Sequence, residues 1–259
     1  MRGFAIFVLC SFALILTPAA VRAHFGIVIP SGATALEQKD ADITLETGFI
    51  HPFARQGMEM AKPKRFFVRH DGEDTDLTES LSATEFFGER AWTAAYKLKT
   101  PGVYIFASVP EPYYESSEDS WIIHYAKTVV AAFGAEDGWD EPLGLPMEII
   151  PLSRPFANYA GNVFSGRVLR NGKPLPDALV EVEFLNRDDR RVAPNVYFET
   201  QTVKTDSNGV FVFGIPWAGW WGFSAIGEGA EKISRDGEDK PVELGGVIWV
   251  EFREPVIKK

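Results

Sequence analysis

Apolar and polar residues alternate with a period of two along several short segments, which is the pattern of a half-buried β-strand. In the first half of the chain these segments are residues 42–50 (DITLETGFI), 63–72 (PKRFFVRHDG), 91–109 (AWTAAYKLKTPGVYIFASV) and 119–133 (DSWIIHYAKTVVAAF). No segment shows a sustained helical period. The pattern therefore predicts an all-β first domain of the sandwich type.

The second half repeats a strand–turn–strand pattern. In residues 162–186 a turn at Asn171-Gly172 follows one strand, and valine alternates with glutamate in the next (VEVEF). Residues 202–216 repeat the strand–turn–strand pattern, with the turn at Ser-Asn-Gly, and residues 246–252 (GVIWVEF) form the last strand. Gly-x-Val, Asn-Gly-Lys-Pro, Ala-x-Val-x-Val and Thr-Asp-x-x-Gly-x-Phe follow one another here. This half therefore resembles the transthyretin-like or carboxypeptidase-regulatory type of β-sandwich.

Between the two halves, residues 134–162 hold four prolines and several glycines, a composition typical of a linker. We place the domain boundary within this stretch. The prediction is an all-β protein of two β-sandwich-like domains, residues 24–157 and 158–259.

Residues 1–23 have the pattern of a secretory signal peptide. Arg2 precedes an apolar run, and Val21 and Ala23 occupy the small-residue positions of a cleavage site. Cleavage there makes His24 the first residue of the mature protein and predicts export to the periplasm. No later stretch approaches the roughly 20 apolar residues of a membrane-spanning helix, so no transmembrane segment is expected in the mature chain.

Composition narrows the chemistry of the mature chain. Its only cysteine, Cys10, lies in the leader, so neither disulfides nor thiolate ligands are available. Removal of the leader leaves a net charge of about −12, which disfavours nucleic acid and anionic membranes as partners and attracts divalent cations. A transition-metal site here must use imidazole, carboxylate, amine or thioether groups.

His24 is the first of four histidines and the most informative. As a mature amino terminus it offers a free α-amine together with ring Nδ1, and these two donors close a six-membered chelate. The alternative is a terminus that frays in solvent, as many do.

The other histidines lie in strand-like segments. His51 precedes Pro52, which favours a strand end beside a loop, and it either binds a metal or only hydrogen-bonds at a sheet edge. His124 is flanked by apolar residues on a strand, where it is either a metal ligand or a satisfied core group. His70 occupies a charged hairpin tip and is expected to be solvated.

Carboxylates near these histidines have no diagnostic spacing. The candidates are Glu59, Glu111, Glu115, Glu118 and Asp119. The signatures of zinc proteases, phosphate-binding loops, calcium-binding hands and Gly-x-Ser-x-Gly hydrolases are absent from the sequence, so catalysis is not predicted.

Three tryptophans gather in residues 217–223 (WAGWWGF). They form either a platform that stacks on carbohydrate or a packed seam between domains. We favour the seam, because soluble proteins expose few large apolar patches.

Several longer motifs cover nearly the whole mature chain. They are AHFGIVIPS at the start, HPF at 51–53, PGVYIF, EPYYE, WIIHYAKTVVAAFG, GWDEPLGL, AGNVFSGRVL and PWAGWWGF. With them the chain resembles the family described as the periplasmic component of ABC-type cobalt/nickel transport systems, also known as domain of unknown function 4198.

The resemblance implies capture of Ni²⁺ or Co²⁺, with Cu²⁺ and Zn²⁺ as alternatives, and delivery to an inner-membrane importer. By motif position it implies His24, His51 and His124 as metal ligands. Neutral imidazoles are required, so binding is expected to weaken below about pH 6. Two alternatives stay open: a copper redox enzyme with an amino-terminal histidine, and a structural or carbohydrate-binding module without metal.

Overall fold

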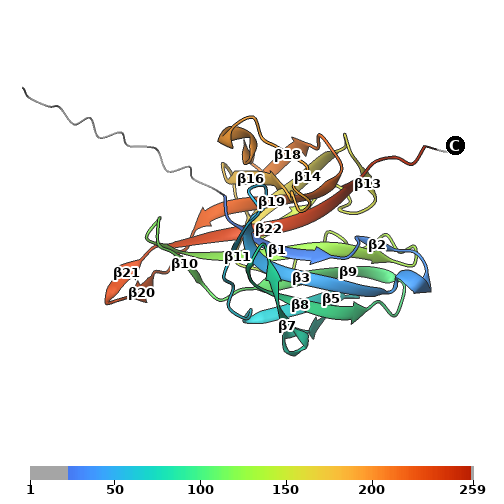
Figure 1. The fold of residues 1–259 in the computed structure, drawn as a ribbon, viewed down its shortest axis with the longest axis horizontal. Coiled ribbons are helices and arrows are strands. Elements are labelled where there is room, and N and C mark those ends of the chain that lie inside the picture. Colours follow the sequence, from blue (N-terminus) through green and yellow to red (C-terminus); the bar gives the residue numbers. More distant parts are fainter. Residues whose placement is uncertain (1–22, 258–259) are drawn as a thin grey trace, which may run out of the picture.

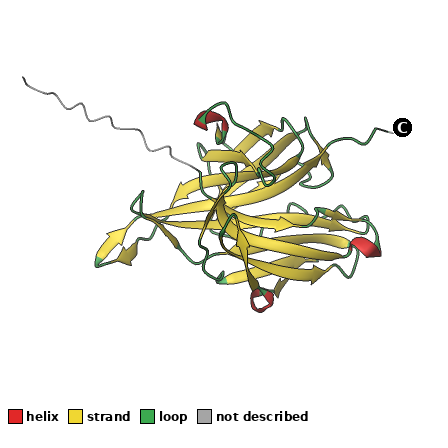
Figure 2. Ribbon diagram, in the orientation of Figure 1, coloured by secondary structure: helices red, strands yellow, loops and turns green. Residues whose placement is uncertain are grey.

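The computed structural model describes residues 23–257, and almost all of its regular structure is β-strand (Figure 2). Helix in this range is limited to three single 3₁₀ turns, at Gln38–Asp40, Thr78–Ser80 and Val196–Phe198. The predicted all-β fold with sandwich packing is confirmed. The predicted leader, apart from Ala23, lies outside the described residues.

A central sheet of eleven strands runs through both halves of the chain. Its main path is β17 (Gln201–Lys204), β16 (Leu179–Phe184), β19 (Gly219–Glu228), β22 (Val242–Arg253), β11 (Ser120–Ala132), β9 (Gly102–Val109), β5 (Arg65–His70) and β6 (Glu73–Asp76). Short strands β2 (Thr34–Ala35), β10 (Tyr113–Glu115) and β13 (Asn158–Tyr159) pair at its margins. The join between the halves is the parallel pair of β11 and β22, which lies mid-sheet (Figure 1).

Two smaller sheets, which we call the first sheet and the third sheet, cover the opposite faces of the central sheet. The first sheet contains β1 (Phe25–Pro30), β3 (Asp42–His51), β4 (Gln56–Met58), β7 (Ser82–Phe86) and β8 (Glu89–Lys97). The third sheet contains β12 (Met147–Pro151), β14 (Val163–Arg170), β15 (Lys173–Pro174) and β18 (Val210–Gly214). A separate hairpin joins β20 (Ile233–Arg235) and β21 (Glu238–Lys240).

Strand β22 serves both cores because its side chains alternate between the two faces. Val247 and Trp249 pack beneath the first sheet, whereas Ile248 and Val250 pack against the third sheet. One shared strand therefore couples the two sandwich-like halves. The predicted boundary between residues 157 and 158 stays a prediction.

Of the three clustered tryptophans, Trp221 is fully buried and Trp217 and Trp220 are half-buried. Trp221 is buried in the core under the third sheet with Trp217 beside it, and Trp220 points to the other face, against residues of the first half. Trp221 Nε1 donates to the Trp217 carbonyl oxygen at 3.0 Å. These contacts support packing and not an exposed stacking platform.

A buried ion pair fastens the segment between the halves to the central sheet. Lys127 Nζ on β11 donates to Glu148 Oε1 on β12 at 2.6 Å, and both side chains are 2% exposed. The backbone N–H of Leu143 also donates to Glu148 Oε1, at 2.9 Å.

Candidate metal centre

Three of the four histidines meet where the first sheet crosses the central sheet. His24 directly precedes β1, and the antiparallel register that pairs Phe25 with Ile50 brings it beside His51 at the end of β3. The two ring centroids are 4.7 Å apart. His124 rises from β11 beneath them, and all three side chains are buried. The predicted cluster is therefore formed by segments 27 and 73 residues apart, counted from His24 to His51 and from His51 to His124.

Phe49 packs between two of these rings. It stacks on His24 with centroids 5.6 Å apart, and it meets His124 edge to face at 5.5 Å. Because Phe49 and His51 lie on the same face of β3, the strand presents both toward the central sheet. The phenyl ring thus fixes how His24 and His124 face each other.

Two glycines make room for His124. A Cβ on Gly245 of the neighbouring strand would lie 2.3 Å from His124 Cδ2, and a Cβ on Gly26 would lie 3.0 Å from the His124 carbonyl oxygen. A Cβ contact of 2.3 Å is not found in real structures, so a side chain at Gly245 would displace the imidazole, whereas one at Gly26 would be tightly crowded. These glycines are needed for close approach and not for turn geometry.

Carboxylates hold two of the rings through the same nitrogen. His24 Nε2 lies 3.3 Å from Glu115 Oε2, and His124 Nε2 lies 3.1 Å from Glu243 Oε1. A neutral imidazole that donates from Nε2 carries its lone pair on Nδ1, and carboxylate–histidine pairs of this kind orient metal-bound histidines. The buried Nδ1 of His124 has no hydrogen-bond partner among residues 23–257.

His51 contacts the residue that precedes the predicted cleavage site. Its Nδ1 lies 2.8 Å from the Ala23 carbonyl oxygen, so Nδ1 is the donor in this pair. In this chain the His24 nitrogen is an amide bonded to Ala23 and is not a ligand. Independently of the amine, the His, Cys, Asp and Glu side chains of residues 23–257 form no group of three or more that is arranged so that it could hold a metal ion.

Burial and charge shift the protonation of the cluster. Burial, together with the charges of His51 and His124, lowers the pKa of His24 to about 4 despite the opposing Glu115. Burial opposes ionisation of Glu243, but the hydrogen bond and charge of His124 prevail and lower its pKa. Burial also opposes ionisation of Glu115, the partner of His24, but hydrogen bonds from Ser117 and His24 lower its pKa, so a neutral His24 ring lies beside an ionised carboxylate.

A second group of acids lies on the same side of the central sheet. Burial raises the pKa of Glu181 to about 7, and the charges of Glu243 and Glu118 add to this rise. Burial also raises the pKa of Glu183 to about 8, although Thr200 Oγ1 and the Phe53 N–H both donate to it.

Of the remaining sequence candidates, Glu118 lies near the cluster, where burial and the charges of Glu243 and Glu115 raise its pKa. The others form pairs of their own. Glu59 pairs with Arg90, Glu111 with Lys64, and Asp119 with Lys240. Glu243 was not among the sequence candidates, because only the parallel pairing of β11 with β22 brings it to His124.

His70 differs from its sequence expectation. It stacks on Tyr104 with centroids 3.9 Å apart, and its ring nitrogens contact the Val103 carbonyl oxygen and Thr100 Oγ1 at 3.2 and 3.0 Å. The expected solvated tip is therefore wrong: Gly102 leaves the space that the imidazole fills. His70 is a packed residue outside the three-histidine cluster.

The fold and the cluster together define an all-β protein with a buried group of three histidines, two of them tied to carboxylates. The family described as "Domain of unknown function (DUF4198)" matches residues 21–229, which include the whole cluster except Glu243. The chain belongs to this family.

Other comparisons add little. No functionally curated protein matched the chain. Among solved structures, "D0-D1 domain of Intimin" is 13% identical, with 86% of this chain and 99% of that one covered and a TM-score of 0.23. The fibronectin(III)-like modules of Clostridium thermocellum CbhA are 9% identical, with 90% and 97% covered and a TM-score of 0.23. The native conformation of E. coli alpha-2-macroglobulin is 10% identical, with 89% and 14% covered and a TM-score of 0.25. These scores are too low to support an argument about fold or function. No helix in residues 23–257 has the length and apolarity needed to cross a membrane.

Proposed function

We propose that the mature protein is a periplasmic binding protein that captures one divalent transition-metal ion, nickel or cobalt, for an inner-membrane importer. The ligands are the α-amine and ring of His24 with the rings of His51 and His124. The observation that carries the proposal is the meeting of three sequence-distant histidines at one buried place, with Nε2 of two of them on carboxylates. The cargo is bound and released without turnover.

Removal of residues 1–23 changes the donor set at this place. Cleavage converts the His24 amide into an amine and removes the carbonyl oxygen that lies 2.8 Å from His51 Nδ1. Because that oxygen and the His24 nitrogen belong to one peptide group, the new amine lies within about 5 Å of His51 Nδ1. Cleavage therefore supplies the α-amine of His24 as a donor and, in the same step, removes the oxygen that His51 Nδ1 contacts.

The donor set favours borderline metals but does not choose among them. Imidazole and amine nitrogens suit Ni²⁺, Co²⁺, Cu²⁺ and Zn²⁺, and copper binds such nitrogen sites more tightly than nickel or cobalt do. The cargo in the cell then depends on supply and on the importer. The family resemblance favours nickel or cobalt.

The test is a titration of two chains with Ni²⁺, Co²⁺, Cu²⁺ and Zn²⁺ by calorimetry. One chain begins at His24, and the other carries one alanine ahead of it. We expect the extension, and His51→Ala or His124→Ala in the first chain, to weaken binding by roughly 100-fold or more, since loss of a supporting residue alone costs 10–100-fold. His70→Ala is the matched control and should bind normally. Equal binding by both chains would refute the amine as a ligand.

A copper redox enzyme is the alternative that the same contact supports. An amino-terminal histidine with a second imidazole 4.7 Å away, centroid to centroid, is also a donor set for copper. Ascorbate-dependent consumption of peroxide by the copper-loaded chain would favour this activity over capture and release.

A further inference from the structure

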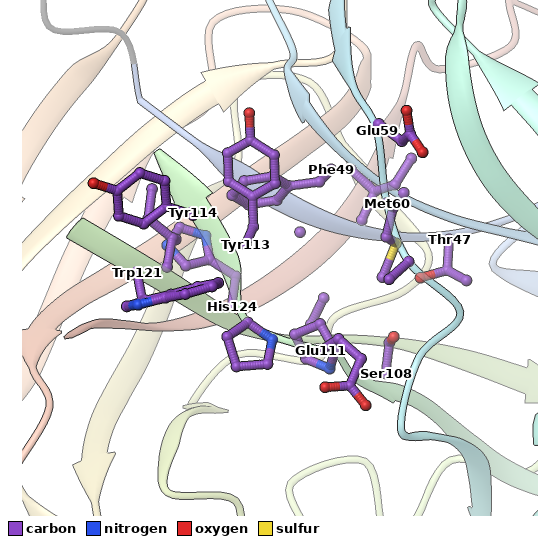
Figure 3. A pocket seen from close by; sticks show the side chains of 18 of the residues that line it. Thr47, Phe49, Glu59, Met60, Ser108, Glu111, Tyr113, Tyr114, Trp121 and His124 are labelled. Carbon is purple, nitrogen blue, oxygen red and sulfur yellow. The ribbon is translucent and has the colours of Figure 1, made fainter. Parts of the chain in front are cut away.

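A pocket of about 270 Å³ lies beside the histidine cluster, between β3 of the first sheet and β10 and β11 of the central sheet. Figure 3 shows the rings of Phe49, Tyr113, Tyr114 and Trp121 along one part of its wall and Thr47 on the opposite part. His124 contributes to the wall as well, so the pocket and the cluster share this one ring.

Buried polar atoms without hydrogen-bond partners concentrate around this pocket. Within residues 23–257 seven buried side-chain nitrogen or oxygen atoms have no partner, and four belong to residues that line it. These four are Thr47 Oγ1, Ser108 Oγ, Trp121 Nε1 and His124 Nδ1. An unpaired buried polar group costs about 1–3 kcal/mol, so native proteins rarely gather several at one place without a ligand or water to pair them.

The walls select an aromatic guest. Phe49 and Tyr113 have ring centroids 5.1 Å apart, and Tyr114 and Trp121 have centroids 5.2 Å apart, so two aromatic pairs border one space. Met60 adds a polarisable thioether. Ring faces and edges of this kind favour a planar guest through offset or edge contacts.

The charged residues at this pocket are already paired. Glu59 contacts Arg90, and Glu111 Oε2 lies 3.2 Å from Lys64 Nζ. Arg235 also lines the pocket, but its guanidinium stacks on Tyr114 at 3.8 Å from the ring centroid, and its Nε lies 3.6 Å from Asp236 Oδ2. A charged guest would therefore be desolvated without an uncommitted counter-charge, which is unfavourable.

We propose that this pocket binds a small, uncharged aromatic molecule that carries a hydrogen-bonding group. The rings of the pocket hold its planar body. The unpaired hydroxyls of Thr47 and Ser108 are fully buried in this conformation, and rotation about their Cα–Cβ bonds turns them toward the polar group of the guest. Since a cavity of about 150 Å³ accommodates benzene, this pocket has room for a benzene ring with a polar substituent or a fused second ring. The site does not need the metal, although the two share His124.

The test uses the metal-free chain that begins at His24, kept in a chelator, with indole, phenol and benzamide as probes. Benzoate and benzylammonium are the charged counterparts. Ligand-observed NMR and calorimetry should show binding of at least one neutral probe and binding at least 10-fold weaker for the charged ones. No binding by any probe at millimolar concentration, or equal binding of charged probes, would overturn the proposal and leave water as the occupant.

Variants locate the binding. Thr47→Val and Ser108→Ala should each lower the affinity for the neutral probe about 5-fold. Ser108→Leu should abolish binding by filling the pocket. The control is Ser224→Ala, which removes another buried, unpartnered hydroxyl away from the pocket and should leave affinity unchanged. His51→Ala, at a residue that does not line the pocket, should also leave it unchanged, so failure of metal capture and failure of this site are distinguishable. An equal effect of Ser224→Ala would contradict the proposed location.

Discussion

Both faces of the central sheet carry an apolar core, but they differ at the end near β10. Against the third sheet, Phe223 meets Phe164 and Phe211 with centroids 4.4 and 5.8 Å away, in a core of apolar side chains. Against the first sheet, the end near β10 instead holds histidines, carboxylates and a pocket with unpaired polar atoms. A closed aromatic core needs no purpose beyond stability. The buried polar groups near β10 are costly because several are unpaired, unlike the paired Lys127 and Glu148 on the third-sheet side, and this is why we propose a binding role for them.

The contrast arises within single strands. In β16, Val180 and Val182 enter the apolar core while Glu181 and Glu183 face the other way and are also largely buried. The alternation of valine and glutamate would ordinarily give a solvent-facing polar surface. Here the chain around Phe53 covers that surface, so the carboxylates of Glu181 and Glu183 are poorly solvated.

Truncation of one phenylalanine on each face tests the contrast most strongly. Phe223→Ala should lower the free energy of unfolding by about 3–5 kcal/mol, because it opens a cavity in a closed core. Phe49→Ala should cost less, about 2 kcal/mol, because water can enter the enlarged pocket. Urea denaturation of both variants measures the difference.

Metal affinity should rank the same two variants in the reverse order. Phe49→Ala removes the ring that packs on both His24 and His124 and should weaken binding about 10-fold, an effect of the size seen for residues that orient ligands. Phe223→Ala should leave the affinity of the folded chain unchanged. Equal stability losses with equal affinities would show that the two faces do not differ in role.

Sequence patterns predicted the strands better than their partners. Residues 91–109 read as two consecutive strands around Pro101-Gly102, and both exist, yet β8 belongs to the first sheet and β9 to the central sheet. The period of two in a sequence indicates which side chains are buried. The same pattern is found whichever sheet the strand belongs to. The partners depend on contacts between distant segments, which no local pattern encodes.

The candidate site shows the same limit. His24, His51 and His124 were predicted from residue type, scarcity and motif, and the structure brings them together. Glu243 was missed because it is 119 residues from His124 and has no local signal. His70 was placed in solvent because its neighbours are charged, and its stacking on Tyr104 depends on the distant Gly102.

A prediction of intermediate size concerns the pH dependence of the free energy of unfolding, to which the buried glutamates of β16 contribute. The pKa of Glu183 is raised to about 8 in the folded chain, above the ordinary value of about 4.3 when unfolded. Folding therefore favours the protonated acid, so its contribution is complete below about pH 4.3 and is lost as the pH rises toward 8. Glu181, with a pKa of about 7, acts in the same direction.

Glu183→Gln mimics the protonated acid, since its amide can still pair with Thr200 and the Phe53 N–H. We expect the decline in unfolding free energy between pH 5 and pH 8 to become shallower by about 2 kcal/mol. Urea midpoints at pH 5, 6.5 and 8 measure it, with Glu85→Gln, an exposed position on β7, as the control. An unchanged slope would mean that Glu183 is ionised in the folded protein.

The smallest expected effect concerns Gly245, where the addition of one methyl group would move a ring of the site while the fold is kept. Its Cβ would lie 2.3 Å from His124 Cδ2, so Gly245→Ala must turn the imidazole away from Glu243 and from the other rings. We expect nickel or cobalt affinity to fall about 10-fold while the fold is retained. Gly227→Ala is the matched control on the adjacent strand β19, because its Cβ would meet only the flexible end of Met147, at 3.1 Å. Calorimetry and the His124 ring NMR signals distinguish the cases: a moved ring with unchanged affinity would remove His124 from the ligand set, and loss of affinity in both variants would point to general disturbance of the sheet.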